Sequence, residues 1–123
     1  MINNRIQTTF QNLKKARKKA LISFVTGCDP DYNTSLKILN ELVKQGVNIL
    51  EIGMVFSDPM ADGPSIQKSN LRALSAGANM KKILKLVGDF RKKNKTTPIV
   101  LMGYMNPILK FGIIKFFNSA KNV

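Results

Sequence analysis

The sequence is short of several residue types on which protein chemistry commonly depends. Histidine is absent from the 123 residues, so no imidazole can act as a general base or a metal ligand. The single cysteine, Cys28, excludes an internal disulfide framework and offers no cluster of metal ligands. No run of about 18 apolar residues could span a membrane, and residues 1–20 lack the apolar segment of a secretory signal. We therefore expect a cytoplasmic protein without a metal site.

Acidic residues are also scarce. Seven carboxylates stand against 20 lysines and arginines, and the net charge is +13, a balance that can indicate nucleic-acid binding. However, the basic clusters fall on segments with a helical pattern, no aromatic residues alternate with them to stack on bases, and no nucleic-acid-binding motif occurs. We favour solvated helix faces and keep nucleic-acid binding as the weaker alternative. The clusters are Lys14–Lys15, Arg17–Lys19, Lys81–Lys82 and Arg91–Lys93.

What the chain does contain is an alternation of helical and strand patterns. Residues 3–19 predict an amphipathic helix, and apolar runs at 21–26, 48–52 and 98–103 predict strands, each followed by helical periodicity. This order predicts a parallel sheet with right-handed crossovers. It suits either a doubly wound sheet or part of a (β/α)8 barrel. The dinucleotide motif G-x-G-x-x-G and the P-loop are both missing, which argues against a Rossmann domain.

Polar residues, proline and glycine predict where the helices begin and end. An Asp or Asn side chain can accept the free N–H groups of a first turn, proline leaves none unpaired there, and glycine often follows the last turn. The expected starts are Asp31 or Asn33, Pro64 and Asn79, the expected ends are Gly46 and Gly77, and residues 108–121 should be mostly helical with a break at Gly112.

Four of the seven carboxylates lie at or just beyond the ends of the first two predicted strands. They are Asp29, Glu51, Asp58 and Asp62. In parallel α/β folds this edge of the sheet is where ligands bind. Asp29 and Asp58 each precede a proline and could equally be turn residues.

Glu51 lies inside a strand pattern, where alternation places it on the same face as Ile49. Burying a carboxylate there costs several kcal/mol unless it is paired or faces a cavity, and burial would raise its pKa. An ion pair with a lysine would explain Glu51, but we favour a general acid and base. Asp62 can approach the same site from the loop, so one carboxylate could move protons while the other stays ionised.

Three segments carry a resemblance that goes beyond these patterns. EIGMVFSDPMADGPSIQ (Glu51–Gln67) resembles the alpha-subunit signature of tryptophan synthase, E-[LI]-G-x-P-[FY]-S-D-P-x-A-D-G-P-x-I-Q. FVTGCDPD (Phe24–Asp31) is similar to the first strand and turn of that family, and PIVLMGYMNPILKFG (Pro98–Gly112) to its third strand and continuation. The resemblance covers essentially the whole chain.

The resemblance implies the N-terminal part of a (β/α)8 TIM barrel, with a barrel-plugging leader helix and three β/α units. It implies retro-aldol cleavage of indole-3-glycerol phosphate to indole and glyceraldehyde 3-phosphate. Glu51 matches the glutamate that shuttles the proton at indole C3, and Asp62 matches the aspartate that accepts the indole N–H. The positions that line or adjoin the indole pocket, for which core packing is an equal alternative, are Phe24, Ile66, Met102 and Tyr104.

The resemblance also implies a partner, the beta subunit of an alpha2beta2 tetramer. Pyridoxal phosphate is expected only in that partner, and no cofactor in this chain. Val55 replaces the usual proline of the loop, which frees its φ, and Cys28 replaces the usual glycine of the first turn, where a positive φ becomes less accessible. The expected contacts with the partner are Val55, Phe56, Asp58, Pro59, Asn106 and Pro107.

A complete barrel of this kind needs about 250 residues. The family's phosphate-binding loops follow strands seven and eight and its lid follows strand six, so the resemblance leaves them outside these 123 residues. We expect an incomplete barrel whose sheet edges and apolar faces are uncovered, and a chain that is inactive or nearly so by itself. The alternative is a non-catalytic piece that binds a beta subunit.

Overall fold

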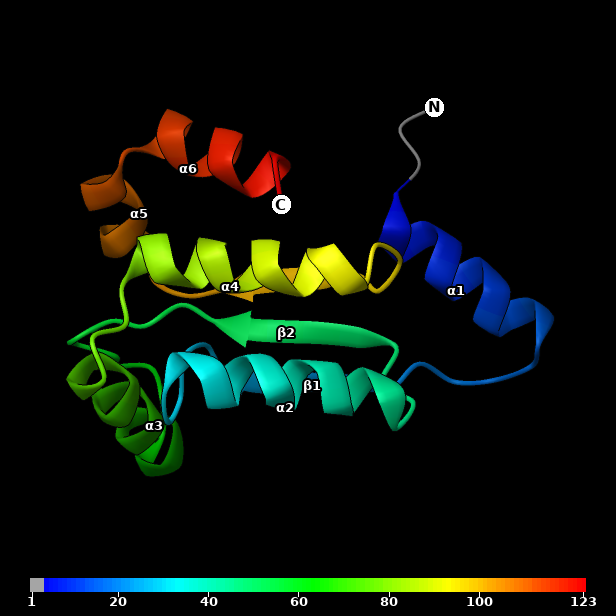
Figure 1. Cartoon of the computed structure of the whole chain (residues 1–123), viewed down its shortest axis with the longest axis horizontal. Coiled ribbons are helices and arrows are strands. Elements are labelled where there is room, and N and C mark those ends of the chain that lie inside the picture. Colours follow the sequence, from blue (N-terminus) through cyan, green and yellow to red (C-terminus); the bar gives the residue numbers. More distant parts are fainter. Residues whose placement is uncertain (1–3) are drawn as a thin grey trace.

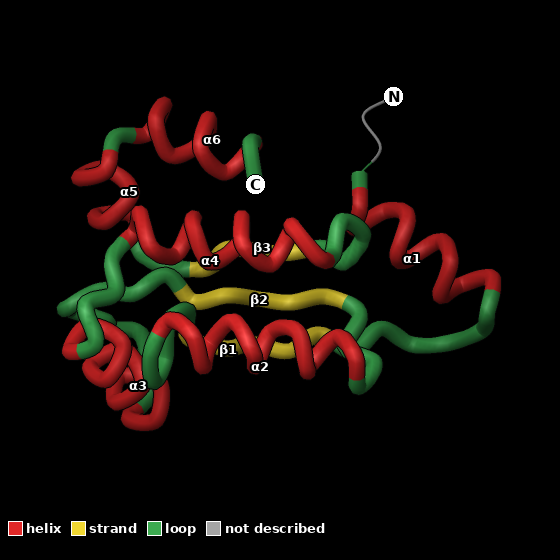
Figure 2. The backbone as a smooth tube through the Cα atoms, in the orientation of Figure 1, coloured by secondary structure: helices red, strands yellow, loops and turns green. Residues whose placement is uncertain are grey.

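A computed structural model describes residues 4–123 as a three-stranded sheet with helices packed along it (Figure 1). Helices and strands alternate after an initial helix, as the sequence predicts, and Figure 2 shows the strands behind the helical layer. The elements are α1 (Arg5–Lys15), β1 (Ile22–Thr26), α2 (Tyr32–Lys44), β2 (Ile49–Gly53), α3 (Pro64–Ser75), α4 (Met80–Lys93), β3 (Ile99–Met102), α5 (Met105–Phe111) and α6 (Ile113–Lys121).

The sheet has the order β1-β2-β3, and both pairs of strands are parallel, which confirms the predicted sheet. Phe24 pairs with Glu51, and Glu51 pairs with Val100, so the three side chains form a row on one face. The strand bounds differ by a residue or so from the predicted 21–26, 48–52 and 98–103. Gly53 belongs to the second strand because it pairs with both Thr26 and Met102.

The hydrophobic core lies between the sheet and the helices. Leu50 and Ile52 of β2 are fully buried, as are Leu39 of α2 and Phe90 of α4, and all four belong to one cluster. Figure 1 shows α2 and α4 side by side along the strands. Burying each such side chain stabilises the fold by about 1.5–3 kcal/mol. This core fixes the sheet on which the candidate site is built.

The opposite face of the sheet is much less covered, and we call it the open face. It carries Ile22, Phe24, Glu51, Val100 and Met102, which share one side of the strands by register. Ile22 is 49% exposed, and Val100 and Met102 are each 39% exposed. The expectation of an uncovered apolar sheet face is therefore confirmed.

Most of the predicted helix ends are confirmed. Asp31, not Asn33, is the N-cap of α2, because its carboxylate accepts the Thr34 N–H at 2.9 Å. Asn79 begins α4 by accepting the Lys82 N–H, and Pro64 is the first residue of α3. Gly46 and Gly77 follow α2 and α3 with φ of 103° and 81°, as glycine allows after a last turn.

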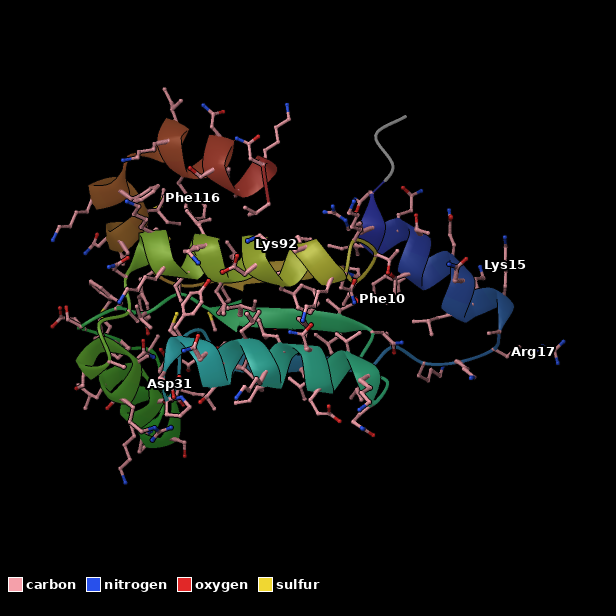
Figure 3. All side chains as sticks on the ribbon, in the orientation of Figure 1. Phe10, Lys15, Arg17, Asp31, Lys92 and Phe116 are labelled. Carbon is pink, nitrogen blue, oxygen red and sulfur yellow. The ribbon has the colours of Figure 1, made fainter. Side chains whose placement is uncertain are left out.

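The bounds of two predicted helical segments differ from the structure. The helix expected over 3–19 runs only from Arg5 to Lys15, because the chain turns at Arg17, whose φ is 53°; residue 3 lies outside the described residues. No residue of α1 is buried, and Figure 3 shows Phe10, Lys15 and Arg17 on this helix and just beyond it.

The break expected at Gly112 within residues 108–121 is confirmed, because two helices meet there. The first begins earlier, at Met105, and Gly112 separates them with a φ of 98°. Phe116 of the second helix is buried against the core (Figure 3).

The prediction that Arg91 faces solvent is wrong. Its guanidinium is half-buried and donates hydrogen bonds to the carbonyl groups of Val123, Asn94 and Thr97. Burial lowers the pKa of Arg91 to about 10, with a contribution from the charge of Arg5. This arginine joins the end of α4 to the end of α6, so it is a structural residue of the fold.

Candidate active site

Glu51 stands on the open face, between Phe24 of β1 and Val100 of β3. It lies two residues before the carboxyl end of β2, and it is partly exposed while its strand neighbours Leu50 and Ile52 are buried. Within residues 4–123 its carboxylate has no hydrogen-bond or ion-pair partner. The alternative of an ion pair with a lysine therefore finds no support in the described part of the chain.

Asp62 lies in the loop between β2 and α3, at the same edge of the sheet. Its Oδ2 accepts a hydrogen bond from the Tyr104 hydroxyl at 3.0 Å. The same hydroxyl accepts the Ala61 N–H at 2.9 Å, and the Asp62 carbonyl accepts a hydrogen bond from the Gln67 side chain. Tyr104 thus contacts the loop at two successive residues, 42 and 43 positions earlier in the chain.

The start of this loop is held by a residue that the sequence analysis missed. Asn70 of α3 is buried, and its Oδ1 accepts the Phe56 N–H at 3.1 Å. Its amide nitrogen donates to the Ile66 carbonyl. An asparagine in the middle of a helical pattern gives no sequence signal for such a contact, because its partner lies 14 residues away in a loop.

The four predicted substrate-pocket residues come from three different segments. Phe24 is partly buried, and a Cβ added at Gly53 would lie 2.8 Å from its ring, so the ring covers Gly53. Met102 is the register partner of Gly53 and shares the open face. Tyr104 follows two residues later and contacts Asp62. Phe24, Met102 and Tyr104 therefore lie close together near the carboxyl ends of the three strands.

The fourth residue, Ile66, reaches the site on the first turns of α3. Its carbonyl accepts a hydrogen bond from the Ser69 hydroxyl, and the oxygen of that hydroxyl lies 2.6 Å from the Thr26 hydroxyl oxygen at the end of β1. Residues three apart on a helix lie on the same side, so Ile66 is on the side of α3 that faces β1.

The turn after β1 is rigidly held. Cys28 keeps a φ of 63° although it replaces glycine, at a cost of about 1–2 kcal/mol for a side chain in this region. Its N–H donates to the Ser35 hydroxyl, and burial raises the pKa of its thiol to about 11. Asp29 forms a bidentate ion pair with Arg72 of α3, both contacts being 2.8 Å. Asp29 therefore joins the turn to α3.

Four of the six predicted partner contacts line one groove of about 700 Å³ beside the carboxyl end of the sheet. Phe56 also packs on Tyr104, with ring centroids 5.4 Å apart. Asp58 and Pro59 do not line this groove; Asp58 is exposed and accepts a hydrogen bond from Ser57. Neither Glu51 nor Asp62 lines it. The four residues are Val55, Phe56, Asn106 and Pro107.

Residues 4–123 contain neither a cluster of metal ligands nor a membrane-spanning helix. No group of three or more cysteine and acidic side chains could hold a metal ion there. Nor is any helix in that range long and apolar enough to cross a membrane.

Comparison with known proteins identifies the family. The family model described as tryptophan synthase alpha chain matches residues 10–123. The tryptophan synthase alpha subunit of Legionella pneumophila is 42% identical, with a TM-score of 0.94 over 97% of this chain. A tryptophan synthase complex from Pyrococcus furiosus contains a chain that is 41% identical over 84% of this one, with a TM-score of 0.78.

A third comparison gives the same result at lower identity. The Mycobacterium tuberculosis tryptophan synthase, in an aminoacrylate-bound form, contains a chain that is 28% identical over 97% of this one, with a TM-score of 0.87. The chain spans 45%, 42% and 48% of these three solved chains, respectively, so its sheet matches part of their barrel. By family match and by fold, this chain belongs to the tryptophan synthase alpha chain family.

Proposed function

We propose that this chain supplies the acid–base side of a tryptophan synthase alpha-reaction site. The reaction is the retro-aldol cleavage of indole-3-glycerol phosphate to indole and glyceraldehyde 3-phosphate, a step of tryptophan biosynthesis. The observation that carries the proposal is Glu51, a carboxylate on the open face opposite Phe24 in the strand register, which has no hydrogen-bond or ion-pair partner within residues 4–123. An unpaired, partly buried carboxylate is otherwise a cost to the fold.

Each carboxylate has a separate role in the proposed step. Glu51 delivers a proton to C3 of the indole ring, and positive charge develops at the ring nitrogen. Asp62 stays ionised, accepts the indole N–H and stabilises that charge. Its Oδ2 already accepts from Tyr104, whereas no donor among the described residues reaches Oδ1, which leaves this oxygen for substrate. The bonding pair of the C–C bond then returns to the indole ring and cancels that charge, while the side-chain hydroxyl gives its proton to the Glu51 carboxylate and becomes the aldehyde.

We further propose that the chain alone does not turn over, because the phosphate-binding loops of the family barrel have no counterpart in these 123 residues. Fusing the chain to the remaining barrel segments of the Legionella pneumophila relative should restore indole release. In this fusion Glu51→Gln should abolish activity, because glutamine cannot transfer the proton.

The chain offers a matched control. Glu41, its only other glutamate, is exposed on α2 and contacts Lys44 and Gln45. Glu41→Gln should leave the rate unchanged within a factor of about two, since exposed ion pairs of this kind contribute little. Full activity of the Glu51→Gln fusion would overturn the catalytic assignment.

A second candidate function is binding of a beta subunit, the partner in which pyridoxal phosphate is expected. The groove lined by Phe56, Asn106 and Pro107 favours it, because apolar grooves of this size suit protein partners. Co-purification with a beta subunit should be lost in Asn106→Lys, which places a charge in the groove. Asn118→Lys, on the exposed side of α6 and outside this groove, is the control. Equal retention of both variants would exclude the groove as the interface.

A further inference from the structure

Tyr104 contacts the loop between β2 and α3, which carries Asp62, in a way that a substrate-lining residue need not. Its hydroxyl donates to Asp62 Oδ2 at 3.0 Å and accepts from the Ala61 N–H at 2.9 Å. Both its hydrogen-bonding roles are therefore used within one loop, and its ring is held separately by Phe56. The hydroxyl is already committed to the protein before any substrate arrives.

The loop from Met54 to Gly63 has few other attachments near Asp62. Its start is held by Asn70, which accepts the Phe56 N–H, and Phe56 lies six residues before Asp62 in the sequence. Around Asp62 itself the contacts other than Tyr104 are local: the Asp62 N–H donates to the Pro59 carbonyl, and Gln67 donates to the Asp62 carbonyl. These local bonds hold the backbone turn, but they leave the carboxylate free to rotate.

We propose that Tyr104 is a positioning residue, whose hydroxyl fixes the Asp62 carboxylate and its loop against the end of β3. This inference rests on the proposed function, because it concerns how Asp62 meets the indole N–H. Tyr104 acts through Asp62: one carboxylate oxygen is bound to the phenol, and the other is held in place for the substrate. A hydrogen bond to a carboxylate is well suited to this, because it is roughly twice as strong as a hydrogen bond between neutral groups.

The electrostatics of Tyr104 agree with the geometry. Burial raises the pKa of the Tyr104 phenol, and the neighbouring Asp62 carboxylate raises it further, so the hydroxyl keeps its proton at neutral pH. A phenol that stays protonated at neutral pH remains a hydrogen-bond donor to the Asp62 carboxylate.

The test compares the chain's two tyrosines, because both donate to an aspartate. Tyr104→Phe keeps the ring contact with Phe56 and removes only the hydroxyl, whereas Tyr32→Phe removes a hydroxyl bonded to Asp89 at 2.6 Å on the α2–α4 surface. In the complete fused enzyme Tyr104→Phe should lower kcat about 10- to 100-fold, the effect of a misplaced catalytic group, with KM changed less than about threefold. Tyr32→Phe should leave both parameters unchanged.

Two readouts do not depend on activity. In Tyr104→Phe the Ala61 amide should exchange its hydrogen about 3- to 10-fold faster, the worth of one neutral hydrogen bond, while the Leu50 amide, bonded to the Pro98 carbonyl, stays protected. In Asp62→Asn the pKa of Tyr104 should fall, as followed by its ring resonances, while that of Tyr32 does not move.

The outcomes separate the two proposals. If the unmodified fusion releases no indole, the proposed function fails, while exchange at Ala61 still decides whether Tyr104 holds the loop. If the fusion is active and Tyr104→Phe matches Tyr32→Phe in kcat, the positioning role is overturned. A Tyr104→Phe variant that raises KM alone would show that Tyr104 binds substrate directly, which also overturns it.

Discussion

Gly27 tests the packing on which the site depends, because there is no room for a side chain at that position. A Cβ added there would overlap Ile83 Cδ1 of α4 and lie 3.0 Å from Ile52 Cγ2 and 3.2 Å from the Gly53 carbonyl oxygen. Ile83 and Ile52 are both fully buried, so neither can move without disturbing the core. Gly27 therefore allows α4 to pack closely against the carboxyl ends of β1 and β2.

The expected magnitude follows from two opposing effects. Overpacking one methyl group into a rigid core costs about 1–3 kcal/mol. Replacing glycine by alanine also reduces the entropy of the unfolded chain, which returns about 0.4–1 kcal/mol. Gly27→Ala should therefore lower the free energy of unfolding by about 1.3 kcal/mol, the difference between the midpoints of these two ranges.

Urea unfolding followed by circular dichroism measures this change, and Gly63→Ala is the control. No atom lies within 4 Å of a Cβ built at Gly63, whose φ of −77° suits alanine. Gly63→Ala should shift the free energy of unfolding by less than about 0.5 kcal/mol. Equal stability of the two variants would refute the close approach of α4 to the strands.

Two further predictions concern titratable groups. Burial raises the pKa of the Cys28 thiol from 9.0 to about 11, so at neutral pH the folded chain holds about a hundredth of the thiolate that the unfolded chain holds. Iodoacetamide reacts with the thiolate and should therefore alkylate Cys28 at least about 100-fold more slowly in the folded chain than in urea. Equal rates would contradict the burial of Cys28. Asp89 accepts hydrogen bonds from Lys85, Lys92 and Tyr32, and the two lysines, the largest causes, hold its pKa below 3.8. Its contribution to stability should therefore be present above about pH 4 and be lost as the pH falls through its lowered pKa, so Asp89→Asn should destabilise the chain at pH 7 and match the parent in acid. A difference in urea midpoint that is independent of pH would contradict this.

Local signals in the sequence predicted most of the fold. Asp31 and Asn79 begin helices by accepting N–H groups three residues away, and Gly46 follows a helix because its φ is positive. The alternation of strands and helices was enough to predict the parallel sheet. Where prediction was wrong, the cause was not local: the basic tail after Lys15 continues a helical pattern, yet the chain turns at Arg17 to reach β1.

Arg91 shows the same limit for side chains. A run of three basic residues at a helix end is typical of a solvated face, but Arg91 reaches carbonyl groups as far as Val123. The Val123 carbonyl lies near Arg91 only because α6 runs back along α4, and no short sequence pattern predicts that contact.

The candidate site divides in the same way. Glu51 could be found from the sequence because a carboxylate in an apolar strand is costly, and Asp62 because it lies in a loop with a recognisable motif. The attachments of that loop could not be found: Asn70 and Tyr104 contact it from other elements, across 14 and 42 residues. Sequence thus predicted the groups proposed to react and named Tyr104 beside the pocket, and the structure added Asn70 and the contacts that Tyr104 makes with the loop.

We propose that Glu51 and Asp62 act only within a barrel completed by segments outside these 123 residues. The most direct measurement adds the remaining barrel segments of a relative in trans, in increasing amounts, and follows indole release from indole-3-glycerol phosphate. We expect no release from the chain alone, a rate that saturates as the complex forms, and no release at any amount with Glu51→Gln. Indole release by the chain alone at the saturated rate, or an active Glu51→Gln complex, would contradict it.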